Sequence, residues 1–263
     1  MPHATRDGLS LYYERAGVGA RDFVFVHGWC CDHSFFQPQF DHFARFARVT
    51  TLDLRGCGAS DRSEDGYAVA TLASDVAGLC AALHLDKPIL VGHSMGGAIA
   101  VELAATAPSL VSAVVAVDPG PIDPLPESRS ALTALAERLE SPDGDDPRLE
   151  YVAGLFLPTD DAERRRRTVE TMSSVPRGIA AASLRGLLDW DGVSALRRCD
   201  VPLLVLLAST GGSNDPPRLR RLRPDVHIGV TVGAGHFNHL DAAGQVNAMI
   251  ERFVDVALEP LGR

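Results

Sequence analysis

The chain has 263 residues, of which 46% are hydrophobic and 22% charged, enough for one well-buried core. Its formal charge of −9 argues against nucleic acid as a partner, because phosphate binding needs a basic surface. No apolar run approaches the ~18 residues that cross a bilayer, and the first residues lack a signal-peptide pattern, so we expect a cytoplasmic protein with no membrane partner.

Short apolar runs recur along the chain, each of a length typical of strands buried on both faces. An alternating segment at residues 9–15 predicts one or two antiparallel strands, and further strands are expected at 23–26, 49–54, 89–91, 111–117, 202–207 and 226–232. Helical patterns lie between them at 71–83, 95–107, 217–222 and 245–256. The alternation predicts an α/β fold with a mostly parallel sheet and helices on both faces.

The alternation stops between residues 119 and 191. This segment begins with several prolines and continues as helical, charged sequence, including four consecutive arginines at 164–167, which we interpret as a solvated helix face. We therefore expect a helical cap at 119–191, inserted into one core domain made of residues 1–118 and 192–263.

Five cysteines occur without a CxxC pair and without a Cys/His cluster at zinc-ligand spacing. An odd number of scattered cysteines is typical of buried free thiols in a reducing compartment. We expect no metal and no cofactor.

Ser94 is the centre of a Gly-His-Ser-Met-Gly motif at residues 92–96, directly after an apolar strand and before a helix. This is the context that a G-x-S-x-G nucleophile needs. The sharp turn strains the central residue, and flanking glycines let the backbones pass closely. The helix that starts at Met95 directs its first amides to the same point and favours negative charge there. Ser94 is therefore the predicted nucleophile, and the adjacent His93 is expected to be structural.

Charge that develops on a carbonyl oxygen needs two fixed N–H donors. We expect one from the backbone of Met95, directly after the nucleophile. The other is expected from Trp29, in the His-Gly-Trp-Cys-Cys loop at residues 27–31.

His236 lies in a Gly-Ala-Gly-His-Phe loop between the last strand and the last helix, where an imidazole can reach a serine at the sheet edge. It is the predicted general base, and a carboxylate should fix its tautomer. Two acids stay open. Asp118 directly ends the strand at 111–117 and is favoured, because it needs little reach. Asp215, the alternative, lies late in the loop after the strand at 202–207.

These motifs, together with Asp-Leu-Arg-Gly-Cys-Gly-Ala-Ser at 53–60, resemble the α/β-hydrolase superfamily over nearly the whole chain. The resemblance implies an eight-stranded sheet, a structural role for the segment 53–60 and a serine esterase or lactonase. In this family the acid more often follows the later strand, as Asp215 does. An acid at the position of Asp118 is a minority arrangement, seen in some dehalogenases, a mycotoxin lactonase and cofactor-free quinolone dioxygenases.

The segment Gly-Trp-Cys-Cys-Asp-His at 28–33 is also similar to Gly-Trp-Cys-His-Asp-His of those dioxygenases. However, Cys31 and Met95 stand where the dioxygenases carry histidines, which argues against oxygenation. Dehalogenation is disfavoured because it needs a carboxylate in place of Ser94.

We therefore expect hydrolysis of a small-molecule carboxylic ester or lactone through an acyl-enzyme. Two alternatives stay open: C–C bond hydrolysis or cofactor-free oxygenation on the same scaffold, and a ligand-binding protein of this fold with slow turnover. The side chains expected to contact substrate are those of Trp29, Phe237, Tyr151 and Phe156. Further candidates for lining the pocket are Leu125, Leu155, Leu157, Met172 and Leu187.

Overall fold

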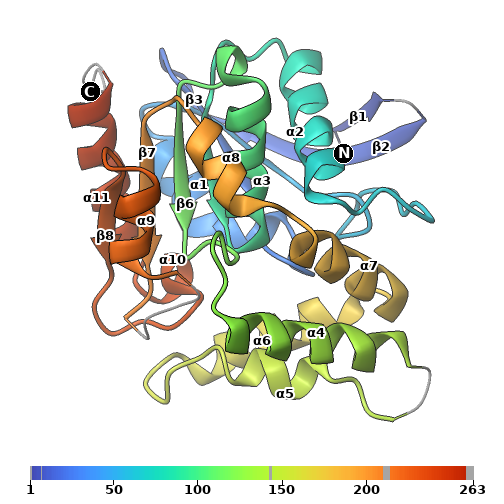
Figure 1. Cartoon of the computed structure of the whole chain (residues 1–263). Coiled ribbons are helices and arrows are strands. Elements are labelled where there is room, and N and C mark those ends of the chain that lie inside the picture. The colour runs from blue at the N-terminus through green and yellow to red at the C-terminus, as the bar shows by residue number, and fades with distance from the viewer. Residues whose placement is uncertain (1, 7, 142–143, 210–213, 259–263) are drawn as a thin grey trace.

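The computed structural model describes residues 2–6, 8–141, 144–209 and 214–258. Their strands form one eight-stranded sheet in the order β1-β2-β4-β3-β5-β6-β7-β8 (Figure 1). The pairs β1–β2 and β2–β4 are antiparallel and the remaining pairs are parallel, which confirms the predicted α/β architecture. The strand bounds are β1 His3–Arg6, β2 Leu9–Ala16, β3 Asp22–Val26, β4 Arg48–Leu52, β5 Ile89–His93, β6 Ala113–Val117, β7 Leu203–Leu207 and β8 His227–Val230.

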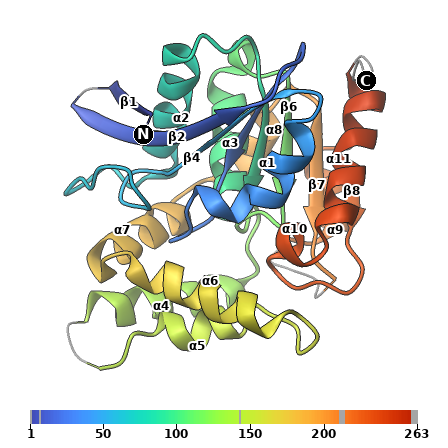
Figure 2. The ribbon, with the colours of Figure 1, turned by 180° about the vertical axis from the view of Figure 1, so that it is seen from behind.

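Helices cover both faces of the sheet (Figures 1 and 2). Alternate residues of a strand point to opposite faces; accordingly Phe23 and Phe25 pack with α1 and α11, whereas Val24 and Val26 belong to the larger core with α2 and α3. The helices outside the segment 119–191 are α1 Gln37–Phe43, α2 Val69–Ala82, α3 Met95–Thr106, α8 Gly192–Arg198, α9 Pro216–Leu222, α10 Asn238–Asp241 and α11 Ala243–Ala257, with short 3₁₀ turns η1 His33–Phe36 and η2 Pro108–Leu110.

Four helices lie between β6 and β7 within the segment 119–191, and we call them the inserted helices: α4 Pro126–Glu140, α5 Arg148–Ala153, α6 Ala162–Ser174 and α7 Arg177–Leu188. They gather at one end of the sheet, at the bottom of Figure 1. α4 packs on α7, and α5 packs on α6. The arginine run lies on α6, where Arg166 and Arg167 are exposed and pair with Glu163, as expected of a solvated helix face. Arg164 departs from this expectation, because it pairs with the nearly buried Asp241 of α10.

All five cysteines are buried and free. Within the described ranges, none of the helices combines the length and the apolar character needed to cross a membrane.

Candidate active site

Ser94 occupies the bend between β5 and α3. Its backbone has φ of 52° and ψ of −119°, a conformation that costs energy in residues other than glycine. The bend is held from both sides: the Ser94 N–H donates to the Val117 carbonyl at 3.0 Å, and the Ser94 carbonyl accepts from Gly97 at 2.9 Å and from Gly120 at 2.8 Å. These backbone hydrogen bonds therefore stabilise the strained conformation of Ser94.

The glycines of the motif are required by space. A Cβ on Gly92 would lie 2.1 Å from the carbonyl oxygen of Gly96, and a Cβ on Gly96 would lie 2.0 Å from the carbonyl oxygen of Val26. Contacts this short do not occur in proteins, so strand and helix can approach this closely only without these side chains.

The loop after β3 turns tightly at residues 28–31. The Gly28 carbonyl accepts from the Cys31 N–H at 3.2 Å and from Nδ1 of His27 at 2.8 Å. The ring of His27 carries its proton on Nδ1, because its Nε2 accepts from the Leu54 N–H at 3.0 Å. The Trp29 N–H belongs to the same peptide and points away from the Gly28 carbonyl. These two contacts therefore fix the direction of the Trp29 N–H, which is the oxyanion donor predicted from the sequence.

The second proposed donor, the Met95 N–H, is the first amide of α3. The first amides of a helix have no acceptor inside the helix. Within the described part of the chain, neither this amide nor that of Trp29 donates a hydrogen bond to another backbone group. Both remain available to a negatively charged oxygen.

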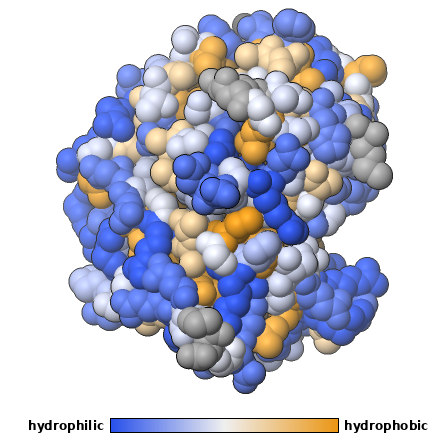
Figure 3. Space-filling model, turned by 90° about the vertical axis from the view of Figure 1, so that its right-hand side faces the viewer, coloured by the Kyte–Doolittle hydropathy of each residue, from blue (hydrophilic) through white to orange (hydrophobic). Residues whose placement is uncertain are grey.

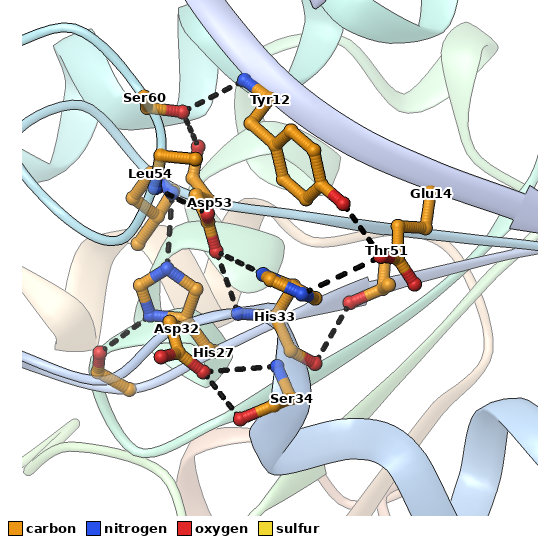
Figure 4. A network of polar contacts seen from close by, with 12 residues as sticks. Tyr12, Glu14, His27, Asp32, His33, Ser34, Thr51, Asp53, Leu54 and Ser60 are labelled. Carbon is orange, nitrogen blue, oxygen red and sulfur yellow. Dashed lines mark hydrogen bonds and ion pairs between the residues drawn. The ribbon is translucent and has the colours of Figure 1, made fainter. Parts of the chain in front are cut away.

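A polar network around the buried Asp53 supports the loop after β3 from the side of β2 and β4 (Figure 4). Asp53 accepts from the backbone N–H of His33 at 2.7 Å, from its Nδ1 at 2.8 Å and from the Ala59 N–H at 2.8 Å. Burial alone would raise the pKa of Asp53, but these hydrogen bonds and the nearby imidazoles lower it overall. In the segment 53–60, Asp53 thus holds neighbouring backbone in place, which is a structural task.

His236 and Asp118 are in direct contact. Nδ1 of His236 donates to Oδ2 of Asp118 at 2.6 Å, and Oδ1 of Asp118 accepts from the Ala208 N–H at 3.0 Å. Asp118 directly follows β6, is 3% exposed and has a φ of 37°, which aspartate tolerates better than most residues. Because the Nδ1 hydrogen of His236 is engaged in the hydrogen bond to Asp118, Nε2 of the neutral imidazole is free to accept a proton.

The backbone of His236 is also held on both sides. Its N–H donates to the carbonyl of Leu155, in the connection between α5 and α6, at 3.0 Å. Its carbonyl accepts from Nε2 of His93 at 2.9 Å. Gly235 allows this approach, because a Cβ there would lie 2.6 Å from the Leu155 carbonyl oxygen.

Asp215, the alternative acid, lies elsewhere. It is the N-cap of α9, where its side chain accepts from the Arg218 N–H at 3.1 Å. The preceding residues 210–213 lie outside the described residues. Of the two candidate acids, the structure brings Asp118 to His236 and gives Asp215 a helix-capping role instead.

Ser94, His236 and Asp118 line one cavity of about 270 Å³. Figure 3 shows the surface indented between the larger upper part of the molecule and the lower lobe that holds the inserted helices. No hydrogen bond joins the described side chains of Ser94 and His236. The inserted helices and the connection after α5 contribute mostly apolar wall residues: Leu132, Tyr151, Gly154, Leu155, Met172, Leu184 and Leu187.

Trp29, Tyr151 and Phe237 line the cavity, as the sequence suggested. The Trp29 indole donates to the carbonyl of Ala180 on α7 at 2.8 Å and meets the Tyr151 ring edge-on. Phe156 does not line the cavity; its ring stacks on that of Phe237 with centroids 4.9 Å apart. Phe156 thus lies behind Phe237, and its contact with substrate stays a prediction.

Among the further candidates, Leu155, Met172 and Leu187 line the cavity, whereas Leu125 and Leu157 do not, and Leu125 is 44% exposed. Sequence analysis missed Leu132 and Leu184. Leu184 lies three positions before Leu187 on α7, and this helical spacing is the signal that could have identified it.

Comparison with known proteins gives the same class of fold. The model of the alpha/beta hydrolase family matches residues 23–249, and the chain therefore belongs to this family of hydrolases. Over 231 residues it is 31% identical to 2-(acetamidomethylene)succinate hydrolase of Mesorhizobium japonicum, with 81% of each chain covered.

Two further proteins are similar to this chain. A stretch of 99 residues is 41% identical to the AB hydrolase superfamily protein YisY of Bacillus subtilis, and this match spans 37% of each chain. The solved structure of a thermophilic esterase from Thermogutta terrifontis superposes with a TM-score of 0.84 at 23% identity, covering 97% of each chain, and shows the same fold.

Proposed function

We propose that this protein is a serine hydrolase that cleaves an uncharged carboxylic ester or lactone. One observation carries the proposal: the His236 imidazole contacts Asp118 at 2.6 Å, and both line the same cavity as Ser94, which stands at a strained bend. This combination is what a nucleophile, a base and an orienting acid need.

In the first half of the proposed reaction, the Ser94 hydroxyl attacks the substrate carbonyl while Nε2 of His236 takes its proton. Asp118 stabilises the resulting imidazolium and does not itself become protonated. The amides of Trp29 and Met95 bind the negatively charged oxygen of the tetrahedral intermediate. The imidazolium then protonates the leaving alcohol, and Ser94 is left acylated.

In the second half, water attacks the acyl-enzyme and His236 acts as base again. The acid product leaves after the Ser94 oxygen recovers its proton. For a lactone, the released alcohol and acid belong to one molecule.

We propose that the inserted helices act as a cap that sets substrate choice. Among the described residues that line the cavity there is neither a lysine nor an arginine, and the wall from these helices is mostly apolar. Such a wall favours an uncharged, largely apolar substrate, because a carboxylate buried there would lack a cationic partner.

Tyr151 adds one polar group to this wall. Burial raises the pKa of its phenol to about 12, so the hydroxyl stays a neutral donor at physiological pH. No hydrogen bond to it occurs within the described part of the chain. We propose that it binds an oxygen of the substrate, since a phenol in such surroundings usually has a partner.

The proposal is tested with p-nitrophenyl esters, lactones and β-diketones on the wild type and on Ser94→Ala. We expect turnover of esters or lactones that disappears in Ser94→Ala. Cleavage of β-diketones alone would indicate C–C hydrolysis. Oxygen uptake that survives in Ser94→Ala would indicate oxygenation, and binding without turnover would indicate a ligand-binding protein.

A further inference from the structure

We infer that His93 is a positioning residue, whose side chain holds the loop that carries the base His236 in register with the nucleophile and with the loop at residues 27–31, which we call the oxyanion loop. The inference rests on the proposed function, in which His236 is the base. It assigns a task to a histidine that neither the motif nor the proposed reaction requires.

His93 is the last residue of β5, directly before Ser94, and is 1% exposed. Its Nε2 lies 2.9 Å from the carbonyl oxygen of His236, 143 residues later in the chain. The two imidazole rings are also neighbours, with centroids 4.6 Å apart. A strand of the rigid sheet thus supplies a side-chain anchor for a loop.

The chemistry of this contact fixes the state of His93. A carbonyl oxygen only accepts, so Nε2 of His93 must carry the proton. Burial lowers the pKa of His93 well below its usual value, and the neighbouring His239 and His236 lower it further. The ring is therefore neutral, with a bare Nδ1 that is buried and has no hydrogen-bond partner among the described residues.

That Nδ1 faces the oxyanion loop. A Cβ built on Gly28 would lie 2.9 Å from Nδ1 of His93 and 3.2 Å from Cβ of Ser94. Gly28 therefore leaves the space that the imidazole fills. One ring is packed between the turn at residues 28–31, the nucleophile bend and the loop of the base.

The anchor at the His236 carbonyl complements the other two contacts of this residue. The His236 N–H is bonded to Leu155 and its Nδ1 to Asp118. Without the hydrogen bond from His93, the carbonyl of His236 loses its donor. The backbone of His236 can then shift, and its imidazole shifts with it. A displacement of ~1 Å at a reacting group can reduce the rate by roughly 10²-fold.

Three substitutions separate the donor from the packing. The amide nitrogen of glutamine lies as far along its side chain as Nε2 of histidine, whereas that of asparagine corresponds to Nδ1. Phenylalanine keeps a ring and removes the donor. We expect His93→Gln to retain kcat within about threefold, and His93→Asn and His93→Phe to lower kcat by roughly 10- to 100-fold with KM unchanged.

His239→Phe is the matched control. His239 is also fully buried and its ring lies 4.1 Å from that of His93, on an element that the proposed reaction does not use. The His239→Phe variant should keep the wild-type kcat. Thermal midpoints of all four variants are measured in parallel, so that a general loss of stability can be recognised.

A second readout does not depend on turnover. The Nδ1 proton of His236, bonded to Asp118, should give a low-field NMR signal in the wild type and in His93→Gln, and a weakened or absent signal in His93→Asn and His93→Phe. Wild-type kcat and an intact signal in His93→Phe would overturn the inference, as would equal losses in all three variants. Turnover that persists in Ser94→Ala would instead refute the proposed function, and the NMR result would still decide the role of His93.

Discussion

Asp118 is the proposed acid of the triad, and its role can be tested against that of Asp215. Its carboxylate fixes the His236 tautomer through the 2.6 Å contact, so Asp118→Asn should lower kcat by ~10⁴-fold, as expected when the orienting acid is removed. The measurement is kcat on the best ester of the panel. Asp215→Asn is the matched control, because asparagine caps a helix as well as aspartate. Wild-type activity in Asp118→Asn with loss in Asp215→Asn would reverse the assignment.

Gly28 is a second residue whose role can be tested, here by adding a single methyl group where there is no room for one. In Gly28→Ala the new methyl group would press on the His93 ring and on Ser94, so we expect kcat to fall at least about tenfold. Gly178→Ala on α7 is the control. A Cβ there meets nothing within 4 Å, so activity should be unchanged and the helix slightly stabilised. Equal activity of the two variants would contradict the close packing at Gly28.

At the residue scale, sequence identifies groups with a local signature and leaves open those defined by long-range geometry. Ser94 and His236 stand in recognisable strand–turn–helix contexts. The choice between Asp118 and Asp215 depends on where two loops place their side chains, which no local pattern encodes. The contact between His93 and the His236 carbonyl joins residues 143 positions apart and is likewise invisible in the sequence.

Among the elements, α5 and α6 are joined by a buried cation. Arg148, 2% exposed, donates to the carbonyls of Met172 and Val175 at the end of α6 and pairs with Asp146. Burial raises the pKa of the Cys30 thiol to about 12, and the Arg148 guanidinium opposes this rise. Through its hydrogen bonds, this side chain joins two of the inserted helices to each other.

Arg148→Met should lower the free energy of unfolding by about 3 kcal/mol, because several buried acceptors lose their donor. Denaturant unfolding measures the effect. Arg185→Met removes a partly exposed ion pair with Glu140 on neighbouring inserted helices and should lower the free energy of unfolding far less, because solvent screens this pair. Equal losses of unfolding free energy in the two variants would show that the buried hydrogen bonds of Arg148 stabilise the protein no more than an exposed ion pair does.

Element types were predicted better than element ends. The expected helix at 95–107 is α3 Met95–Thr106, and the strand at 226–232 is β8 His227–Val230. The short helices α1, α8 and α10 were missed, whereas α9, which is seven residues long like α1, was expected at 217–222. Segments this short show few turns, so a helical period identifies some of them and not others.

For the whole molecule, buried neutral histidines predict a loss of stability in acid. Burial lowers the pKa of His27 and His93, and lowers that of His239 to about 3. In the unfolded chain each takes up a proton below pH ~6.5, whereas in the folded chain it does not. Stability should therefore fall as the pH drops below about 6.5. His33 acts in the opposite direction, because its hydrogen bond to Asp53 raises its pKa.

The net slope between pH 6 and pH 4.5 should correspond to one or two protons, ~1.4 to ~2.7 kcal/mol per pH unit. Denaturant unfolding across this range measures it. In His239→Phe the slope should decrease by up to one proton. A wild-type stability that stays flat between pH 6.5 and 4.5 would contradict burial of these rings in the neutral form.

The architecture as a whole was accessible from sequence because each buried strand is a continuous apolar run and the sheet is mostly parallel. The composition of the cavity was accessible only in part. Part of its wall comes from four helices whose mutual packing depends on contacts such as that of Arg148 with α6, and these contacts form only in the folded chain.

The most direct test of the central claim is covalent labelling with a p-nitrophenyl phosphonate, followed by intact-mass and peptide mass spectrometry. A phosphonate traps a nucleophile that an adjacent base activates. We predict one adduct per chain, on Ser94, that is absent in Ser94→Ala and forms much more slowly in Asp118→Asn and His236→Ala. An unlabelled wild type, or an adduct on another residue such as Cys31, would contradict the account.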